Sequence, residues 1–338
     1  METKSKILTV VLCVYNAEKY LSEAIESILN QTYKNFDFFI VDDGSTDQSL
    51  DIIKKYANAD SRIFLHENVE NKGVSYSRNY AISQCKTKYI ALMDADDVSL
   101  PERIEKQINF LENHPNISVC GTWFTLFGEN INQQLIQHPE GHDQIKVNML
   151  FDCCIGNPTL MFKSEIFNNF QFIKKYIPID DYELWSRALF KYNFSNIQES
   201  LLNYRWHSTN ISQTKKVDIN KLHLEIRKNQ LLNLKPDLTE DQLSQLDSLT
   251  RPLNAIPFNE LIKVLDLMKE LLAINLKKNI YNQNYLKDFF YKNCLELTKS
   301  GKGNSLKFTW LVISEFQDVF NLLNFKEKKR LFKKCFRR

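Results

Sequence analysis

The chain of 338 residues lacks a long hydrophobic run, and no stretch reaches the roughly 18 consecutive apolar residues of a membrane-spanning helix. Its first apolar segment runs directly into polar motif residues, so we expect a first β-strand there rather than a signal peptide. The charge is also small, because 44 basic and 41 acidic residues leave a net charge of +3. This balance gives no reason to expect a nucleic acid as partner. Any membrane contact is therefore expected to be peripheral.

Paired cysteines and glycine-rich nucleotide motifs are missing as well. The seven cysteines are scattered and form no CxxC. An odd, scattered set is typical of reduced thiols in a cytosol, and not of a disulfide framework or a zinc site. No GxGxxG follows the first apolar segment and no GxxxxGK[ST] occurs, which removes the fingerprints of dinucleotide and P-loop sites. A nucleotide site in this chain must use other groups.

The segment YIALMDADDVSLP at 89–101 supplies such groups. Its apolar half is typical of a buried strand, and it ends in Asp94, Asp96 and Asp97. Three carboxylates this close repel one another unless a cation shares them. Mg²⁺ and Mn²⁺ take oxygen ligands of this kind and bridge them to phosphates. The alternative is a solvated acidic turn before a helix that begins near Pro101.

The first hundred residues alternate buried, β-branched or aromatic runs with amphipathic segments. We expect strands at 6–14, 36–41, 62–66 and 89–93, and helices at 17–30, 48–56 and 74–83. Strand–helix alternation with short connections predicts an α/β fold with a mostly parallel sheet flanked by helices. In such sheets, ligands bind beyond the carboxyl ends of the strands.

Polar residues follow three of these strands, at one predicted edge of the sheet. They are Tyr15-Asn16, Asp42-Asp43 and Asp94 to Asp97. We interpret Asp43 as a contact to the base or ribose, with an Asx-turn in DDGSTD as the alternative. Arg78, in the helix after the third strand, is a candidate for contact with a diphosphate, and a surface arginine is the competing interpretation.

The following hundred residues add a second acidic pair and a histidine. We expect a long strand or a strand pair at 118–127, a short strand at 159–162 and a last strand at 201–207. Asp180 and Asp181 stand where either can N-cap a helix, and where a carboxylate oriented by backbone N–H groups can act as general base. His207 is a candidate ligand for a metal or phosphate, although a lone histidine is usually structural.

From about residue 215 the pattern becomes helical throughout. We therefore predict an α/β domain at 1–214 and a helical C-terminal region at 215–338. The last residues, 325–338, place apolar side chains on one helical face and cations on the other. Such a tail can lie on an anionic membrane surface, and packing on the domain is the alternative.

Six motifs in this order and spacing resemble inverting glycosyltransferase family 2, which has the GT-A fold. They span about Lys6 to Ser212 and read VVLCVYNAEKYL, NQTYKNFDFFIVDDGSTDQSL, NKGVSYSRNYAI, LMDADDVSLPERI, IDDYELW and YRWHSTNIS. Within the family, the chain is most similar to bacterial lipooligosaccharide β-1,3-N-acetylglucosaminyltransferases.

The resemblance implies roles for the matching residues. Asp181 would be the general base, although Asp180 stands where the family has a longer glutamate and can compete for that role. Mn²⁺ or Mg²⁺ would be held by Asp96, Asp97 and His207. The UDP-sugar would be held by Tyr15, Asn16, Asp43, Arg78, Asp94 and Asp96.

The resemblance also implies the reaction. A hexose, GlcNAc first, would pass with inversion from a UDP-sugar to a hydroxyl of a lipid-linked surface glycan, such as the terminal galactose of a lipooligosaccharide. The enzyme would be cytoplasmic or peripheral on the inner face of the cytoplasmic membrane. Alternatives are another UDP-hexose transferase of capsule or O-antigen assembly, a nucleotidyltransferase and a non-catalytic glycan-binding module. The missing basic phosphate loop disfavours the nucleotidyltransferase, and the intact acidic positions disfavour the binding module.

Overall fold

The computed structural model describes residues 6–208, 210, 218–250, 258–299 and 313–314. Contacts divide the chain into two compact units. The first consists of residues 1–145 and 153–219, and the second of residues 146–152 and 220–338. The sequence prediction placed one boundary after residue 214 and kept 146–152 in the first domain, whereas these seven residues associate with the C-terminal helices.

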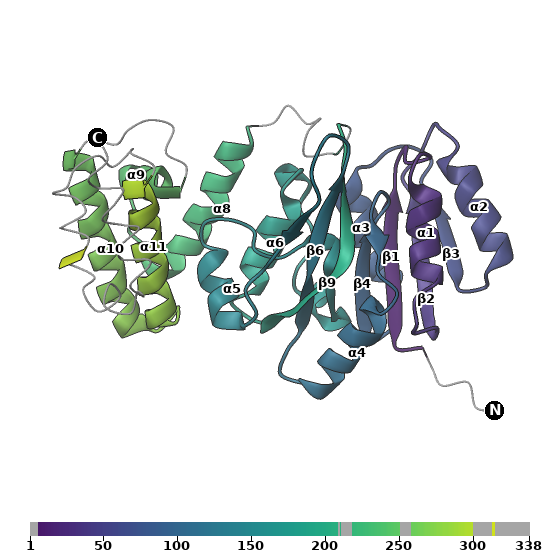
Figure 1. The fold of residues 1–338 in the computed structure, drawn as a ribbon, viewed down its shortest axis with the longest axis horizontal. Helices are drawn as coiled ribbons and strands as arrows, with labels where there is room; N and C mark the ends of the chain where they lie inside the picture. Colours follow the sequence, from purple (N-terminus) through teal and green to yellow (C-terminus); the bar gives the residue numbers. More distant parts are fainter. Residues whose placement is uncertain (1–5, 209, 211–217, 251–257, 300–312, 315–338) are drawn as a thin grey trace. The chain divides into compact units, whose positions relative to one another are not determined.

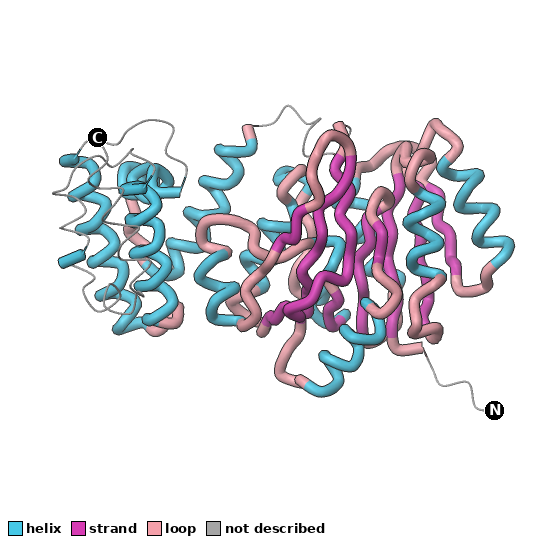
Figure 2. The backbone as a smooth tube through the Cα atoms, viewed as in Figure 1, coloured by secondary structure: helices cyan, strands magenta, loops and turns pink. Residues whose placement is uncertain are grey.

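The first unit is built on one mixed sheet, with strand order β3-β2-β1-β4-β8-β6-β9-β5 and β7 paired to β6 (Figures 1 and 2). Its parallel half is formed by β1 (Leu8–Val14), β2 (Phe36–Asp42), β3 (Ile63–Glu67) and β4 (Tyr89–Asp94). The other half contains β5 (Val98–Ser99), β6 (Val119–Gly128), β7 (Gln134–Ile136), β8 (Met161–Lys163) and β9 (Phe194–Trp206).

Helices connect the parallel strands, as the alternation predicted. They are α1 (Leu21–Leu29), α2 (Ser49–Ala59) and α3 (Val74–Gln84), and α4 (Arg103–Asn113) follows between β5 and β6. In α1, the buried residues Leu21, Ala24, Ile25 and Ile28 recur every three or four positions and form one apolar face. They pack into a core with the buried strand residues, such as Leu12, Phe38 and Met93. The predicted α/β fold is confirmed.

The two longest strands, β6 and β9, lie parallel to each other through shifts in their pairing. The region at 118–127 is thus one long strand and not a pair. Strand β9 begins seven residues before the predicted 201, because its first part is polar. There Ser195 and Asn196 bond the backbone carbonyls of Glu140 and Pro139 with their side chains. This part was not recognisable as a buried strand from its composition.

Short elements complete the first unit. They are α5 (His142–Asn148), which ends in the second unit, η1 (Asn157–Thr159), η2 (Ser164–Asn168), η3 (Lys174–Tyr176) and α6 (Asp180–Ala188). The helix expected at Pro101 begins two residues later, at Arg103.

The described part of the second unit is helical (Figure 2). Its helices are α8 (Ile219–Leu234), of which Ile219 belongs to the first unit, α9 (Glu240–Thr250), α10 (Phe258–Lys278) and α11 (Gln283–Lys299). Fully buried Arg227 donates to the carboxylate of Asp247 and, at 2.7 Å, to the carbonyl of Phe151. Among the described helices, none is long and apolar enough to cross a membrane. The basic tail at 325–338 lies outside the described residues.

Candidate active site

The carboxyl ends of β1, β2 and β4 meet at one edge of the sheet, as the parallel topology requires. Asn16, directly after β1, has φ 51°, a left-handed conformation that asparagine tolerates better than most residues. Its side-chain oxygen accepts from the backbone N–H of Thr46 at 2.8 Å, and its own N–H donates to the hydroxyl of Ser45. Asn16 therefore joins the loops after β1 and β2, while neighbouring Tyr15 is 49% exposed.

Asp43 is buried and organises the loop that precedes α3. Its carboxylate accepts from the Asn68 amide at 2.7 Å and from the backbone N–H groups of Lys72 and Gly73 at 3.0 and 2.8 Å. The turn within DDGSTD is made by Asp42, which accepts from the N–H of Ser45. The side-chain bond of an Asx turn, to the N–H two residues on, is made by Asp47, whose Oδ1 accepts from Ser49 at 3.0 Å. The Asx-turn interpretation therefore does not apply to Asp43, which fixes the backbone beside the predicted nucleotide site.

Arg78 connects the two acidic groups of the sequence. One guanidinium nitrogen donates to Asp94 at 2.9 Å, and the other lies 4.0 Å from Asp180. The side chain is 13% exposed and packs on the ring of Phe172, so the surface-arginine interpretation is wrong. Burial alone would lower the pKa of Arg78, but the surrounding acids, Asp94 first, raise it above its ordinary value. Arg78 is thus permanently charged.

Asp96 and His207 form a pair at the end of β9. His207 Nε2 lies 2.9 Å from Asp96 Oδ2, and the amide of Asn210 donates to the same oxygen at 3.2 Å. The Asn210 side-chain oxygen accepts from the backbone N–H of His207 at 2.7 Å, which fixes the histidine. Burial and the charge of Asp94 raise the pKa of Asp96, and His207 opposes that shift.

Asp97 points into a different environment from Asp96. It is 1% exposed, and its Oδ1 accepts from the backbone N–H of Arg205 at 2.8 Å. Its Oδ2 is buried and has no hydrogen-bond partner. Burial, reinforced by Asp96 and Asp94, raises the pKa of Asp97 well above its ordinary value. One oxygen of Asp97 is thus bonded to the backbone of β9, and the other is left without a hydrogen-bond partner.

The pair Asp180-Asp181 occupies the first turn of α6. The N-cap is Ile179, so the interpretation of either acid as the N-cap is wrong. Within the first turn, the Oδ1 of Asp181 accepts from the backbone N–H of Tyr182 at 2.8 Å. Asp180 is buried and accepts from the hydroxyl of Ser75 at 2.6 Å. Burial, followed by the charge of Asp180, raises the pKa of Asp181 to about 6, against the opposing effect of Arg78. A carboxylate with this pKa is ionised at neutral pH and is a better proton acceptor than an ordinary aspartate.

Tyr204 lies among both acidic groups. Burial raises the pKa of its phenol, and four carboxylates raise it further, namely Asp97, Asp94, Asp96 and Asp181. The sequence reasoning missed Tyr204, Ser75 and Asn210 as parts of this region. Tyr204 and Asn210 belong to YRWHSTNIS, so the motif marked the segment without revealing which atoms face the carboxylates. Ser75 belongs to NKGVSYSRNYAI, but that motif did not reveal its contact with Asp180, which is 105 residues away.

The donor atoms suit a divalent cation shared with a ligand. Within the described ranges, no three or more His, Cys, Asp or Glu side chains form a ready cluster for a metal. Asp96 Oδ2 and His207 Nε2 nevertheless lie 2.9 Å apart, so one carboxylate and one imidazole are available side by side. Mg²⁺-like ions are commonly bound by one or two carboxylates together with substrate phosphates, rather than by a complete protein cage. The residues present fit that mode.

Comparisons with known proteins identify the family. Residues 9–193 match the sequence model described as glycosyl transferase family 2. The chain is 39% identical over 209 residues to an uncharacterized glycosyltransferase of Methanocaldococcus jannaschii, covering 60% of this chain and 72% of the relative. It is 34% identical over 209 residues to the Escherichia coli O-antigen biosynthesis glycosyltransferase WbnJ, covering 60% and 80%.

A further relative and a solved structure extend the comparison. The E. coli UDP-Glc:α-D-GlcNAc-diphosphoundecaprenol β-1,3-glucosyltransferase WfaP is 31% identical over 216 residues, covering 62% of this chain and 81% of the relative. The crystal structure of S. aureus TarS with UDP aligns with a TM-score of 0.56 at 17% identity, covering 92% of this chain and 89% of TarS. This chain has a GT-A-like fold and is a member of glycosyl transferase family 2.

Proposed function

We propose that the protein transfers a hexose from a UDP-sugar to a hydroxyl of a lipid-linked glycan, with inversion at the anomeric carbon. The observation that carries this proposal is the bridge made by Arg78, which contacts Asp94 at 2.9 Å and approaches Asp180 to 4.0 Å. It places the acids after β4 and the acids of α6 in one site. An electrostatic group for a leaving diphosphate and a base for an acceptor hydroxyl are then available together.

Asp181 is the proposed base. In a single displacement, the acceptor oxygen bonds to the anomeric carbon as the bond to the UDP oxygen breaks, and the hydroxyl proton passes to the Asp181 carboxylate. Its pKa of about 6 keeps it unprotonated at pH 7. Asp180 is buried and accepts from the hydroxyl of Ser75 at 2.6 Å, which occupies one of its oxygens. This division of roles favours Asp181 over Asp180.

The diphosphate end of the donor is assigned to Asp96, His207 and Arg78. Asp96 and His207 would hold Mn²⁺ or Mg²⁺, which when bound supplies positive charge against the leaving diphosphate. Arg78 adds a fixed positive charge in the same region. Tyr15 and the loop fixed by Asp43 and Asn16 are assigned to the uridine. Asp97 lies behind this set and supports it through Arg205.

The finer assignment starts from the relatives. WfaP uses UDP-Glc on a diphosphoundecaprenol-linked GlcNAc, and TarS has been crystallised with UDP-GlcNAc. We therefore propose GlcNAc and Glc as the first donors to test, with Gal and GalNAc next. The acceptors are lipid-linked saccharides, including those that end in galactose.

UDP release by the purified chain of 338 residues tests the proposal. Each UDP-sugar is offered with lactose, with methyl glycosides or with a diphospholipid-linked GlcNAc, in Mn²⁺ and in EDTA. We expect acceptor-stimulated, EDTA-sensitive release with one donor and a β-linked product by NMR. An α-linked product would overturn inversion, and release unaffected by EDTA would overturn the metal assignment.

A further inference from the structure

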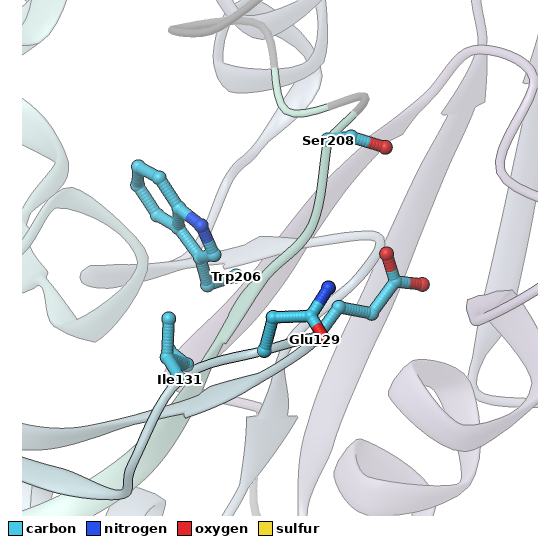
Figure 3. Close-up of a pocket in the computed structure, with 5 residues that line it drawn as sticks. Glu129, Ile131, Trp206 and Ser208 are labelled. Atoms are coloured by element: carbon cyan, nitrogen blue, oxygen red, sulfur yellow. The ribbon is translucent and has the colours of Figure 1, made fainter.

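A pocket of about 440 Å³ opens where β6 and β9 end, and the function proposed above does not use it (Figure 3). Its lining is Glu129, Asn130, Ile131, Trp206 and Ser208. The volume lies at the lower end of the roughly 300–1,000 Å³ of ligand pockets. Figure 3 shows the Trp206 indole and the Glu129 carboxylate on opposite sides of it. The pocket therefore combines part of one aromatic side chain with hydrogen-bonding groups.

The backbone turn at residues 128–130, which forms one side of the pocket, has a fixed conformation. Gly128 has φ 137°, and a Cβ there would come within 2.1 Å of the carbonyl oxygen of Trp206, so only glycine fits. The next residue, Glu129, donates its N–H to that same carbonyl at 3.0 Å. Asn130 then takes φ 58°. This turn is fixed against Trp206 before any ligand arrives, which lowers the entropic cost of binding one.

The pocket is also fixed relative to the proposed reaction centre. Trp206 directly precedes His207, whose ring contacts Asp96. On the other side, the Glu129 carboxylate accepts from the hydroxyl of Tyr20 at 3.1 Å, and the Tyr20 ring lies 5.0 Å from the His207 ring. Tyr20 thus links the pocket residue Glu129 to His207, which we assign to the diphosphate end of the site.

The lining suits a neutral saccharide. A sugar ring has an apolar C–H face, which matches an indole, and an edge of hydroxyls, which matches a carboxylate, an amide and a hydroxyl. No cation is among the described lining residues. The Lys19 ammonium lies 2.9 Å from the Glu129 carboxylate and is paired with that acid, which disfavours a phosphate group as the ligand. We propose that this pocket binds a neutral hexose ring of the acceptor, with its C–H face on Trp206 and its hydroxyls on Asn130, Ser208 and Glu129. That the bound saccharide is the acceptor rests on the proposed transferase function. That the pocket binds a saccharide rests on the pocket alone.

Ligand-observed saturation-transfer NMR tests saccharide binding without any turnover. The probes are methyl β-galactoside and methyl β-N-acetylglucosaminide, offered to the full chain. We expect transfer to the ring C–H protons of at least one probe, its loss in Trp206→Ala and its partial retention in Trp206→Phe. Absence of transfer to both probes with the wild type, or undiminished transfer with Trp206→Ala, would overturn the proposal.

Two further variants keep the test decisive if Trp206→Ala does not fold. Asn130→Gly removes the amide but accommodates the positive φ, so the turn is preserved and binding weakens by about three- to tenfold. Leu135→Ala is the matched control, because Leu135 is 48% exposed on the neighbouring strand β7 and outside the lining. Asn130→Gly that folds and binds like Leu135→Ala would overturn the assignment.

Kinetics separates this proposal from the proposed function. With an active donor and acceptor, Trp206→Ala should raise the acceptor KM about ten- to thirtyfold and change the donor KM less than twofold. An unchanged acceptor KM with normal turnover would overturn the subsite while the transferase function stands. Wild-type protein that binds the glycosides through Trp206 but turns over no UDP-sugar would overturn the function while the subsite stands.

Discussion

The structure contains two comparable pairs of adjacent aspartates, Asp96-Asp97 after β4 and Asp180-Asp181 at the start of α6. In each pair one carboxylate is almost fully buried and bonded to the framework. Asp97 accepts from the backbone N–H of Arg205, and Asp180 accepts from the hydroxyl of Ser75. The other member of each pair, Asp96 or Asp181, stays partly exposed at the site.

The comparison shows how two adjacent aspartates at the end of a strand or the start of a helix can take different roles. Consecutive residues in a tight loop or a first helical turn point in different directions, so one side chain can fix the backbone while its neighbour faces a ligand. The buried member is the second residue in one pair, Asp97, and the first residue in the other pair, Asp180. Spacing along the sequence cannot reveal that choice.

The strongest test compares the members of the α6 pair. Asp181→Asn should lower kcat by about 10²–10⁴, because the base is lost. Asp180→Asn should lower it less than about tenfold, because the amide oxygen still accepts from Ser75. UDP affinity, measured by calorimetry, should stay near the wild-type value in both variants. Equal losses of kcat would break the distinction.

The second test compares the members of the β4 pair. Asp96→Ala should weaken Mn²⁺-dependent UDP binding about 10- to 100-fold, and His207→Ala should weaken it by a similar factor. Asp97→Asn keeps the acceptor for the Arg205 N–H and should bind UDP almost normally. Titrations with and without Mn²⁺ measure the difference. If Asp97→Asn loses as much affinity as Asp96→Ala, Asp97 also holds the cation.

The pH dependence of turnover sharpens the assignment of the base. Asp181 has a pKa of about 6 and must lose its proton to act as base. The logarithm of kcat/KM should therefore rise with pH at unit slope up to about pH 6 and then level off. Asp180→Asn removes a charge that raises this pKa, so the bend should move to lower pH. A profile flat from pH 5 to 8 would contradict the role of Asp181.

The smallest expected effect is on stability. Because folding raises the pKa of Asp181 from its ordinary value near 4 to about 6, the contribution of this group to stability falls as the pH rises through that window. Asp181→Asn should therefore raise the free energy of unfolding at pH 7 by about 1–2 kcal/mol, and by nothing at pH 3.5. Ser75→Ala should lower it by about 1–3 kcal/mol, because Asp180 loses its partner in a buried place. Denaturation at the two pH values measures both.

Much of the fold could be predicted because burial leaves a pattern in the sequence. The runs ending at Val14, Asp42 and Asp94 are apolar since they lie in the middle of a covered sheet. The polar start of β9 gave no such pattern. Topology alone predicted that the residues at the strand ends lie close together, because the carboxyl ends of parallel strands share one edge of the sheet.

The partners of those residues could not be predicted. Asp94 and Arg78 are 16 positions apart, Asp180 and Ser75 are 105 apart, and Asp96 and His207 are 111 apart. No local periodicity records such contacts, because they arise when separate elements pack. For the same reason the sequence left open whether Asp180 or Asp181 is the N-cap of α6, although the hydrogen bond of Asp180 goes to Ser75 in α3.

The assignment of residues 146–152 to the second unit has a consequence for dividing the protein. The chain passes between the units three times, at 145/146, 152/153 and 219/220, so no single cut releases either unit intact. A fragment that ends near residue 214 would keep the carbonyls of Met149 and Phe151 but lose Gln230 and Arg227, which bond them. It would also expose the ring of Phe151, which stacks on Phe289. Excision of the catalytic half therefore requires redesign of this inserted segment.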